Sequence, residues 1–120
     1  MEKNIATAIF ESLSSGVRLD AYRLLVRQGK TGLVAGELAS ALSVPATNMS
    51  FHLKAMVHAN IVTVAQEGRY MRYRANFALM LDLIAYLTEE CCEGHPEQCL
   101  ELRSQCAPEA LPDVCCPKPE

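Results

Sequence analysis

The residues with the most distinctive chemistry in this 120-residue sequence are its cysteines. All six lie in the last thirty positions, and the chain has no cysteine before them. They are Cys91, Cys92, Cys99, Cys106, Cys115 and Cys116. Thiolates are soft ligands that prefer soft ions. The clustering therefore predicts a thiol site for such an ion near the C-terminus.

Cys91, Cys92 and Cys99 are the expected ligands. Adjacent cysteines on a helix point about 100° apart, so both reach one ion only where the helix frays. Gly94 and Pro96 favour fraying there, and the short loop returns Cys99 to the pair at small entropic cost. Three thiolates with no obligatory fourth ligand suit trigonal-pyramidal As(III) or Sb(III).

Two other readings of these thiols stay open. Zn(II), Cd(II) or lead could use the same cysteines, because His95 would complete the four ligands that zinc prefers. Redox sensing needs an easily formed thiolate, but three neighbouring glutamates and the negative end of a helix dipole oppose thiolate formation. A complex of arsenite with three thiolates carries no net charge, which favours arsenic. Cys106, Cys115 and Cys116 are accessory candidates.

The elements that would position these residues are mostly helical. Apolar residues recur at helical spacing over residues 5–13, 17–27, 36–42, 45–60 and 77–87. Residues 61–65 and 70–74 instead alternate with a period of two around a turn, which predicts a β-hairpin. We therefore predict a mainly α fold with a small β-hairpin, in the order of a winged helix-turn-helix.

The last predicted helix is apolar nearly all round, with Asp82 as its only charge. Such a helix has to be covered on more than one side, so we expect a homodimer formed through the first and last helices.

Residues 1–93 are the predicted DNA-binding and dimerisation domain, and residues 94–120 are predicted to form a flexible, cysteine-rich tail. No apolar run approaches the ~18 residues of a membrane span, so we expect a cytoplasmic protein with no membrane partner and with reduced thiols.

Charge is unevenly distributed along the chain. The net charge is −3, yet residues 46–76 carry four cations against Glu67 alone, while residues 89–120 carry eight acidic residues against two cations. This pattern indicates a basic surface for phosphate and an acidic tail that stays away from it.

Two motifs occur together at a specific separation. Residues 45–54 read P-A-T-N-M-S-F-H-L-K, and residues 67–74 read E-G-R-Y-M-R-Y-R. With A-N-I-V at residues 59–62, the sequence resembles the ArsR/SmtB family of metal-responsive repressors over roughly residues 5–92. The resemblance implies a homodimer that binds double-stranded operator DNA and is released by an effector.

The resemblance also implies which side chains contact DNA. The family's major-groove positions fall on Ala46, Thr47, Asn48, Ser50, Phe51 and His52. Asn48 suits adenine, and Thr47 suits a hydrogen bond or a thymine methyl group. Lys54 and the wing residues Arg69 and Arg72 would contact phosphate or the minor groove.

The ion sites known in the family are not reproduced. Residues 33–38 lack the cysteines of its arsenic-sensing pattern E-L-C-V-C-D-L. The positions that match the family's zinc and cobalt ligands are occupied by Asp82, Ile84, His95 and Gln98. Half of the family's ligand set is therefore missing. The family moves its inducer site among helices, which makes Cys91, Cys92 and Cys99 a plausible relocated site.

The sequence is therefore interpreted as an arsenite- or antimonite-responsive repressor. We expect no enzyme, because the sequence shows no activated nucleophile, paired catalytic carboxylates or phosphate-binding loop. The remaining alternative from another class is a metal-sequestering protein whose winged helix binds other proteins.

Overall fold

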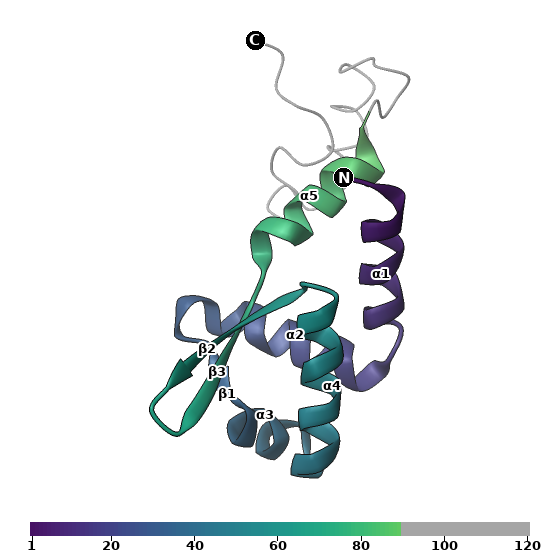
Figure 1. The fold of residues 1–120 in the computed structure, drawn as a ribbon. Helices are drawn as coiled ribbons and strands as arrows, with labels where there is room; N and C mark the ends of the chain where they lie inside the picture. Colours follow the sequence, from purple (N-terminus) through teal and green to yellow (C-terminus); the bar gives the residue numbers. More distant parts are fainter. Residues whose placement is uncertain (90–120) are drawn as a thin grey trace, which may run out of the picture. The chain divides into compact units, whose positions relative to one another are not determined.

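The computed structural model describes residues 1–89, so all six cysteines and His95 lie outside the described residues. Residues 2–79 form one compact unit, and α5 begins in this unit and ends in a second one. In chain order, the elements are α1 (Lys3–Leu13), α2 (Gly16–Gln28), the short 3-10 helix η1 (Gly29–Thr31), β1 (Leu33–Val34), α3 (Ala35–Leu42), α4 (Ala46–His58), β2 (Val62–Glu67), β3 (Tyr70–Ala75) and α5 (Phe77–Thr88) (Figure 1). The predicted helices and the hairpin are confirmed to within a few residues.

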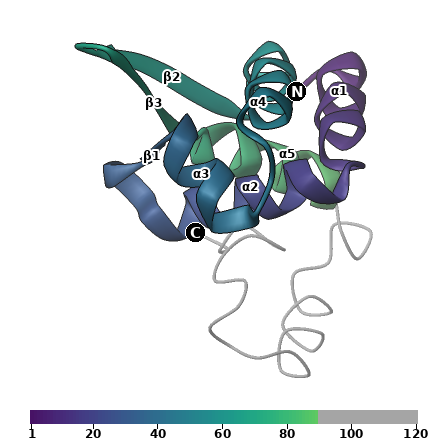
Figure 2. The same cartoon turned by 90° about the horizontal axis from the view of Figure 1, so that it is seen from below.

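The sheet has three antiparallel strands in the order β1-β3-β2. In the hairpin, Val62 pairs with Ala75 and Glu67 with Tyr70, so the turn consists of Gly68 and Arg69. The tip of this wing projects away from the helices in both views (Figure 1 and Figure 2). The sequence analysis predicted only the hairpin. The third strand, β1, pairs Leu33 with Tyr73 and is two residues long, too short for an alternating pattern to reveal it.

The core of residues 2–79 is built from side chains of α1, α2, α3 and α4 and from the start of β2. The largest fully buried side chains are Ile9, Leu25, Leu38, Met49, Leu53, Met56, Ile61 and Val62. In α4, Met49, Leu53 and Met56 follow the i, i+4, i+7 spacing that places side chains on one helix face. This anchoring fixes the rotation of α4 about its axis and turns the opposite face to solvent.

The turn between α3 and α4 sets the direction of the second helix. Ser43 ends α3 in the left-handed conformation, with a φ of 54°. The amide of Val44 then donates to the carbonyl of Ala39 at 3.0 Å, which satisfies one of the last free carbonyls of α3. Pro45 precedes the first helical residue of α4, Ala46. This is the tight helix-turn-helix connection that the sequence predicts.

Several apolar side chains that a helical pattern would bury are exposed in the single chain. On α1 these are Ile5 and Phe10, and on α2 they are Leu19 and Val26. On α5, Phe77, Leu81 and Leu87 are exposed. Within residues 1–89, no helix is long and apolar enough to cross a membrane.

Candidate nucleic-acid interface

The solvent face of α4 carries the side chains that the sequence predicts to contact DNA. Ala46, Thr47, Asn48, Ser50, Phe51 and Lys54 are all exposed, and His52 is half-buried. Phe51 is the most exposed large apolar residue of the described chain, at 69%. The structure thus brings the predicted major-groove residues together on one surface.

The N-terminal end of α4 suits an anion. Thr47, Asn48 and the other first-turn residues include no acidic side chain, and the first amides of a helix lack intrahelical acceptors. Together with the helix dipole, these amides favour a negatively charged group such as a DNA phosphate.

A polar chain connects α4 to the other helices. His52 Nδ1 lies 3.2 Å from Nη1 of Arg18, a residue of α2. Arg18 Nε donates to the carbonyl of Ser12 in α1 at 2.5 Å, and the His52 ring packs edge-on against Phe51 with a centroid distance of 5.9 Å. Sequence reasoning did not identify Arg18 as a functional residue, because its partner is 34 positions away.

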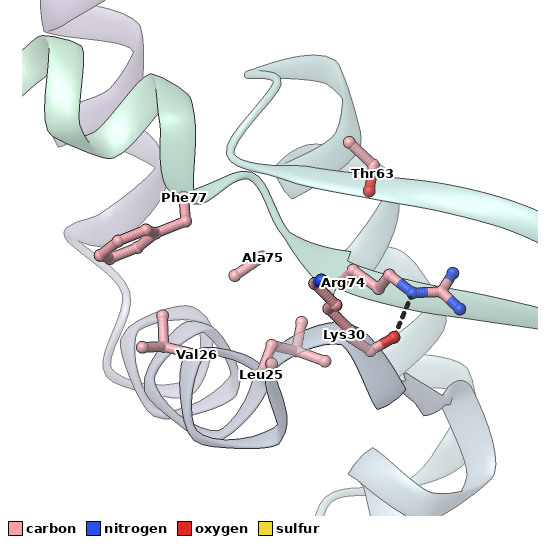
Figure 3. Close-up of a pocket in the computed structure, with 8 residues that line it drawn as sticks. Leu25, Val26, Lys30, Thr63, Arg74, Ala75 and Phe77 are labelled. Carbon is pink, nitrogen blue, oxygen red and sulfur yellow. Dashed lines mark hydrogen bonds between the residues drawn. The ribbon is translucent and has the colours of Figure 1, made fainter.

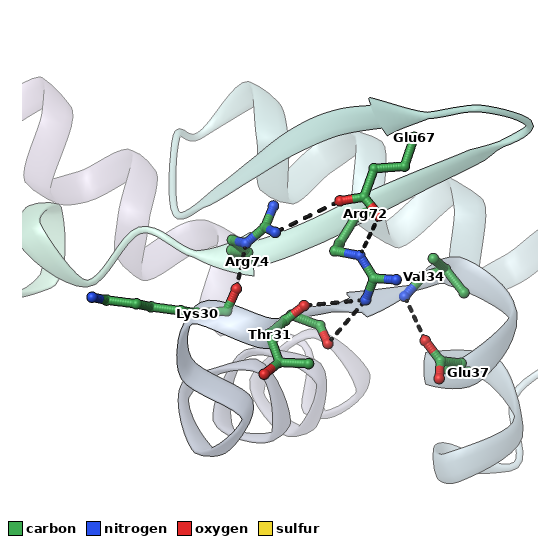
Figure 4. Close-up of polar contacts among 8 residues, drawn as sticks. Lys30, Thr31, Val34, Glu37, Glu67, Arg72 and Arg74 are labelled. Carbon is green, nitrogen blue, oxygen red and sulfur yellow. Dashed lines mark hydrogen bonds and ion pairs between the residues drawn. The ribbon is translucent and has the colours of Figure 1, made fainter.

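The wing carries three arginines with different surroundings. Arg69 is exposed in the turn and has no ion pair or side-chain hydrogen bond among residues 1–89. Arg72 Nε instead donates to Glu67 Oε1 at 2.8 Å, and its Nη1 donates to the carbonyl of Thr31 at 3.1 Å (Figure 4). Arg74 Nε donates to the carbonyl of Lys30 at 2.7 Å. Arg72 and Arg74 therefore tie the wing to η1, which precedes β1.

Glu67 is the acidic partner in this network. Its side chain also lies 3.7 Å from Arg74 Nη2. The hydrogen bond from Arg72 lowers the pKa of the Glu67 carboxyl and raises the pKa of the Arg72 guanidinium. Arg72 thus already has a negative partner, whereas Arg69 offers its charge without one in the described chain. The DNA contact of Arg72 stays a prediction, and Arg69 is the better candidate for phosphate.

A hollow of about 450 Å³ lies where the end of α2 approaches the base of the wing. Leu25 and Val26 line it on one side, and Ala75 and Phe77 on another (Figure 3). The remaining lining residues are Gly29, Lys30, Thr63 and Arg74. None of these eight residues is an acid, a histidine or a cysteine, so they provide none of the side chains that most often bind metal ions.

The described chain also contains no metal site elsewhere. Within residues 1–89, no three side chains among histidine, cysteine, aspartate and glutamate gather closely enough to hold an ion. The exposed face of α4 and the wing together form the candidate functional surface of residues 1–89.

Comparison with known families and structures agrees with this geometry. The helix-turn-helix domain family matches residues 13–65, the range that contains α2, α3 and α4. The chain carries a winged helix-turn-helix domain. A comparison with curated protein sequences finds no match.

Three solved structures illustrate the similarity of this winged helix-turn-helix domain. An ArsR-like transcriptional regulator from Rhodococcus sp. RHA1 is 24% identical, with a TM-score of 0.64 over 85% of this chain and 92% of that one. The homodimeric winged helix-turn-helix DNA-binding domain of a possible ArsR-family regulator from Mycobacterium bovis is 25% identical, with a TM-score of 0.58 over 77% and 85% of the two chains.

The third structure is the AntR antimony-specific transcriptional repressor, which is 23% identical with a TM-score of 0.55 over 82% of this chain and 78% of that one. At these identities the shared feature is the fold. The domain match and these neighbours together show a winged helix-turn-helix fold.

Proposed function

We propose that this protein is an ArsR-family transcriptional repressor that binds operator DNA as a homodimer and leaves it when As(III) or Sb(III) binds Cys91, Cys92 and Cys99. The observation that carries the DNA-binding part is the solvent face of α4. Its polar side chains stand opposite the buried Met49 and Leu53, and α4 lies within the range that matches the helix-turn-helix domain family.

The chemistry of this face fits the major groove. Asn48 can form paired hydrogen bonds with adenine, and Thr47 can bind either kind of base edge. The exposed Phe51 ring can contact a thymine methyl group, which would favour A·T pairs at that position. Lys54 and Arg69 supply cations for phosphates on either side.

A homodimer accounts for the exposed apolar side chains of two helices. Ile5 and Phe10 on α1, and Leu81 and Leu87 on α5, are exposed although they are large and apolar. Exposed apolar patches commonly mark interfaces between proteins, and the related domain from Mycobacterium bovis is described as homodimeric. In a dimer, the two copies of α4 would enter major grooves one turn apart, at about 34 Å.

The effector is assigned from the thiols. Residues 1–89 contain no cysteine, and all six are in the remaining segment. Cys91, Cys92 and Cys99 offer the three soft ligands that As(III) and Sb(III) prefer, and one protein of the same fold is an antimony-specific repressor. The alternative is that Zn(II) or Cd(II) binds the same cysteines together with His95. Competition between these ions and arsenite for the protein distinguishes the two possibilities.

Release follows from coupling between ion binding and DNA binding. The dimer would have one geometry that places both α4 helices in the grooves and another that does not. An ion that binds the second geometry more tightly weakens DNA binding, and the size of the effect is set by the difference in the ion's affinity for the two geometries. A coupling of about 2 to 3 kcal/mol would weaken operator binding roughly 30- to 150-fold.

The DNA assignment predicts two different kinds of mutant. Lys54→Ala and Arg69→Ala should weaken binding to every duplex and each reduce the slope of log affinity against log salt by about 1, because each removes one phosphate contact. Asn48→Ala should instead cost about 1 to 3 kcal/mol at one base pair and relax the preference there. Fluorescence anisotropy across a salt series, on a duplex selected from a random pool and on a scrambled duplex, measures both effects.

Lys3→Ala is the matched control for Lys54→Ala, since it removes an exposed lysine from the start of α1. It should leave affinity and salt slope unchanged. Lys54→Ala is expected to lose similar affinity for selected and for scrambled DNA. If Asn48→Ala did the same, the result would show that α4 does not read sequence.

A further inference from the structure

The hydrogen bond between Arg18 and His52 fixes which nitrogen of the imidazole carries the proton. A guanidinium has five N–H donors and no acceptor. At 3.2 Å from Arg18 Nη1, His52 Nδ1 must therefore accept. In a neutral imidazole the other nitrogen is then the donor, so His52 carries its proton on Nε2.

Arg18 is itself held in place. Its Nε donates to the carbonyl of Ser12 at the end of α1, and its backbone amide donates to the Ser15 hydroxyl that caps α2. The guanidinium thus bridges α1 and α4 from a fixed position at the start of α2. Because the His52 ring also packs edge-on against Phe51, its orientation is constrained from two sides.

We propose that Arg18 is a positioning residue that makes His52 present a single N–H donor, at Nε2, to an oxygen or nitrogen acceptor on DNA. This inference rests on the proposed function. The half-buried ring sits on α4 next to Phe51, the most exposed apolar side chain of that face. The acceptor is either a phosphate oxygen or a guanine N7 or O6 atom, which share the ability to accept but differ in sequence dependence.

The tautomer is measured first, in the free protein, by long-range ¹H–¹⁵N correlation of the imidazole nitrogens. We expect His52 to be entirely in the Nε2–H form. His58, exposed at the end of the same helix without a ring contact in the described chain, provides the averaged reference. Arg18→Met should shift His52 toward that average, and Arg23→Met, which removes an exposed arginine of α2, should not.

Two substitutions of His52 then separate positioning from DNA contact. In His52→Gln, the new amide places an N–H donor near the position of the imidazole Nε2. In His52→Asn, the shorter side chain places an acceptor near the position of Nδ1 and leaves no donor at that of Nε2. We expect His52→Gln to retain operator affinity within about threefold and His52→Asn to lose about tenfold, the value of one hydrogen bond. A loss on selected DNA alone identifies a base acceptor, and an equal loss on scrambled DNA identifies a phosphate.

The opposite order, with Asn binding better than Gln, would show that His52 serves only to join α4 to Arg18. An Nδ1–H tautomer in the free protein would overturn the inference whatever the DNA affinity. If the wild-type protein bound no DNA but kept the Nε2–H form, the proposed function and the donor role would fail, and the positioning by Arg18 would stand.

Discussion

Replacing Cys91, Cys92 or Cys99 by serine is expected to abolish arsenite-induced release from operator DNA while leaving operator affinity within a few-fold of wild type. Trigonal As(III) needs three sulfurs, and a serine hydroxyl is a poor ligand for this soft ion. The side chains of α4 that are proposed to read DNA lie in a different part of the chain, so DNA binding itself should survive. Anisotropy titrations with and without arsenite measure both quantities on the same reduced protein.

Two control variants test the choice of ligands. Removal of Cys106, Cys115 and Cys116 together should lower the total metal bound without preventing release. His95→Ala should have no effect on arsenite, which uses no imidazole here, but should weaken a zinc complex. A Cys99→Ser protein that arsenite still releases would move the third ligand to one of the other cysteines.

The second large effect is expected from Gly32→Ala, which should lower the free energy of unfolding by about 3 kcal/mol or more. Gly32 is buried with a φ of +62°, and an added Cβ would sit 2.4 Å from the carbonyl oxygen of Tyr73. That oxygen belongs to the central strand of the sheet and cannot rotate away. Gly32 also lies beside the carbonyls that hold Arg72 and Arg74, so the wing anchor would be disturbed. Urea unfolding monitored by circular dichroism measures the loss.

Gly68→Ala is the matched control, because Gly68 has the same φ of +62° but nothing within 4 Å of the added Cβ. It should cost only the left-handed strain of a non-glycine residue, about 1 kcal/mol. Gly36→Ala, in the first turn of α3 with open space around it, should be neutral or stabilising by up to about 1 kcal/mol. Equal losses at Gly32 and Gly68 would mean that the contact with Tyr73 is not the cause.

The helix-turn-helix could be predicted from sequence because its signals are local. Met49, Leu53 and Met56 keep a helical period, and the closing turn with Gly68 lies between two alternating segments. Strand β1 gave no such signal, since it is defined by pairing with a strand about forty positions away. The exposure of Leu19 could not be predicted either, because a helical period shows which residues share a face and not what covers that face.

The candidate site was predictable only in part. The exposed positions of Thr47, Asn48 and Phe51 follow from the anchored opposite face of α4. The pairing of Arg72 with Glu67 and of Arg18 with His52 could not be read from the sequence, because each depends on how elements pack in space. In the structure the positive charge of Arg72 is paired with Glu67 within the wing. The composition of the chain does not reveal this ion pair.

The most direct test of the account is operator release by competing ions, measured on reduced full-length protein together with bound ion per dimer. Arsenite is expected to bind with loss of three reactive thiols per ion and to weaken operator affinity roughly 30- to 150-fold. Zinc and cadmium should displace it poorly and release little DNA. Release by zinc or cadmium but not by arsenite, or unchanged operator affinity with arsenite bound, would contradict the proposal.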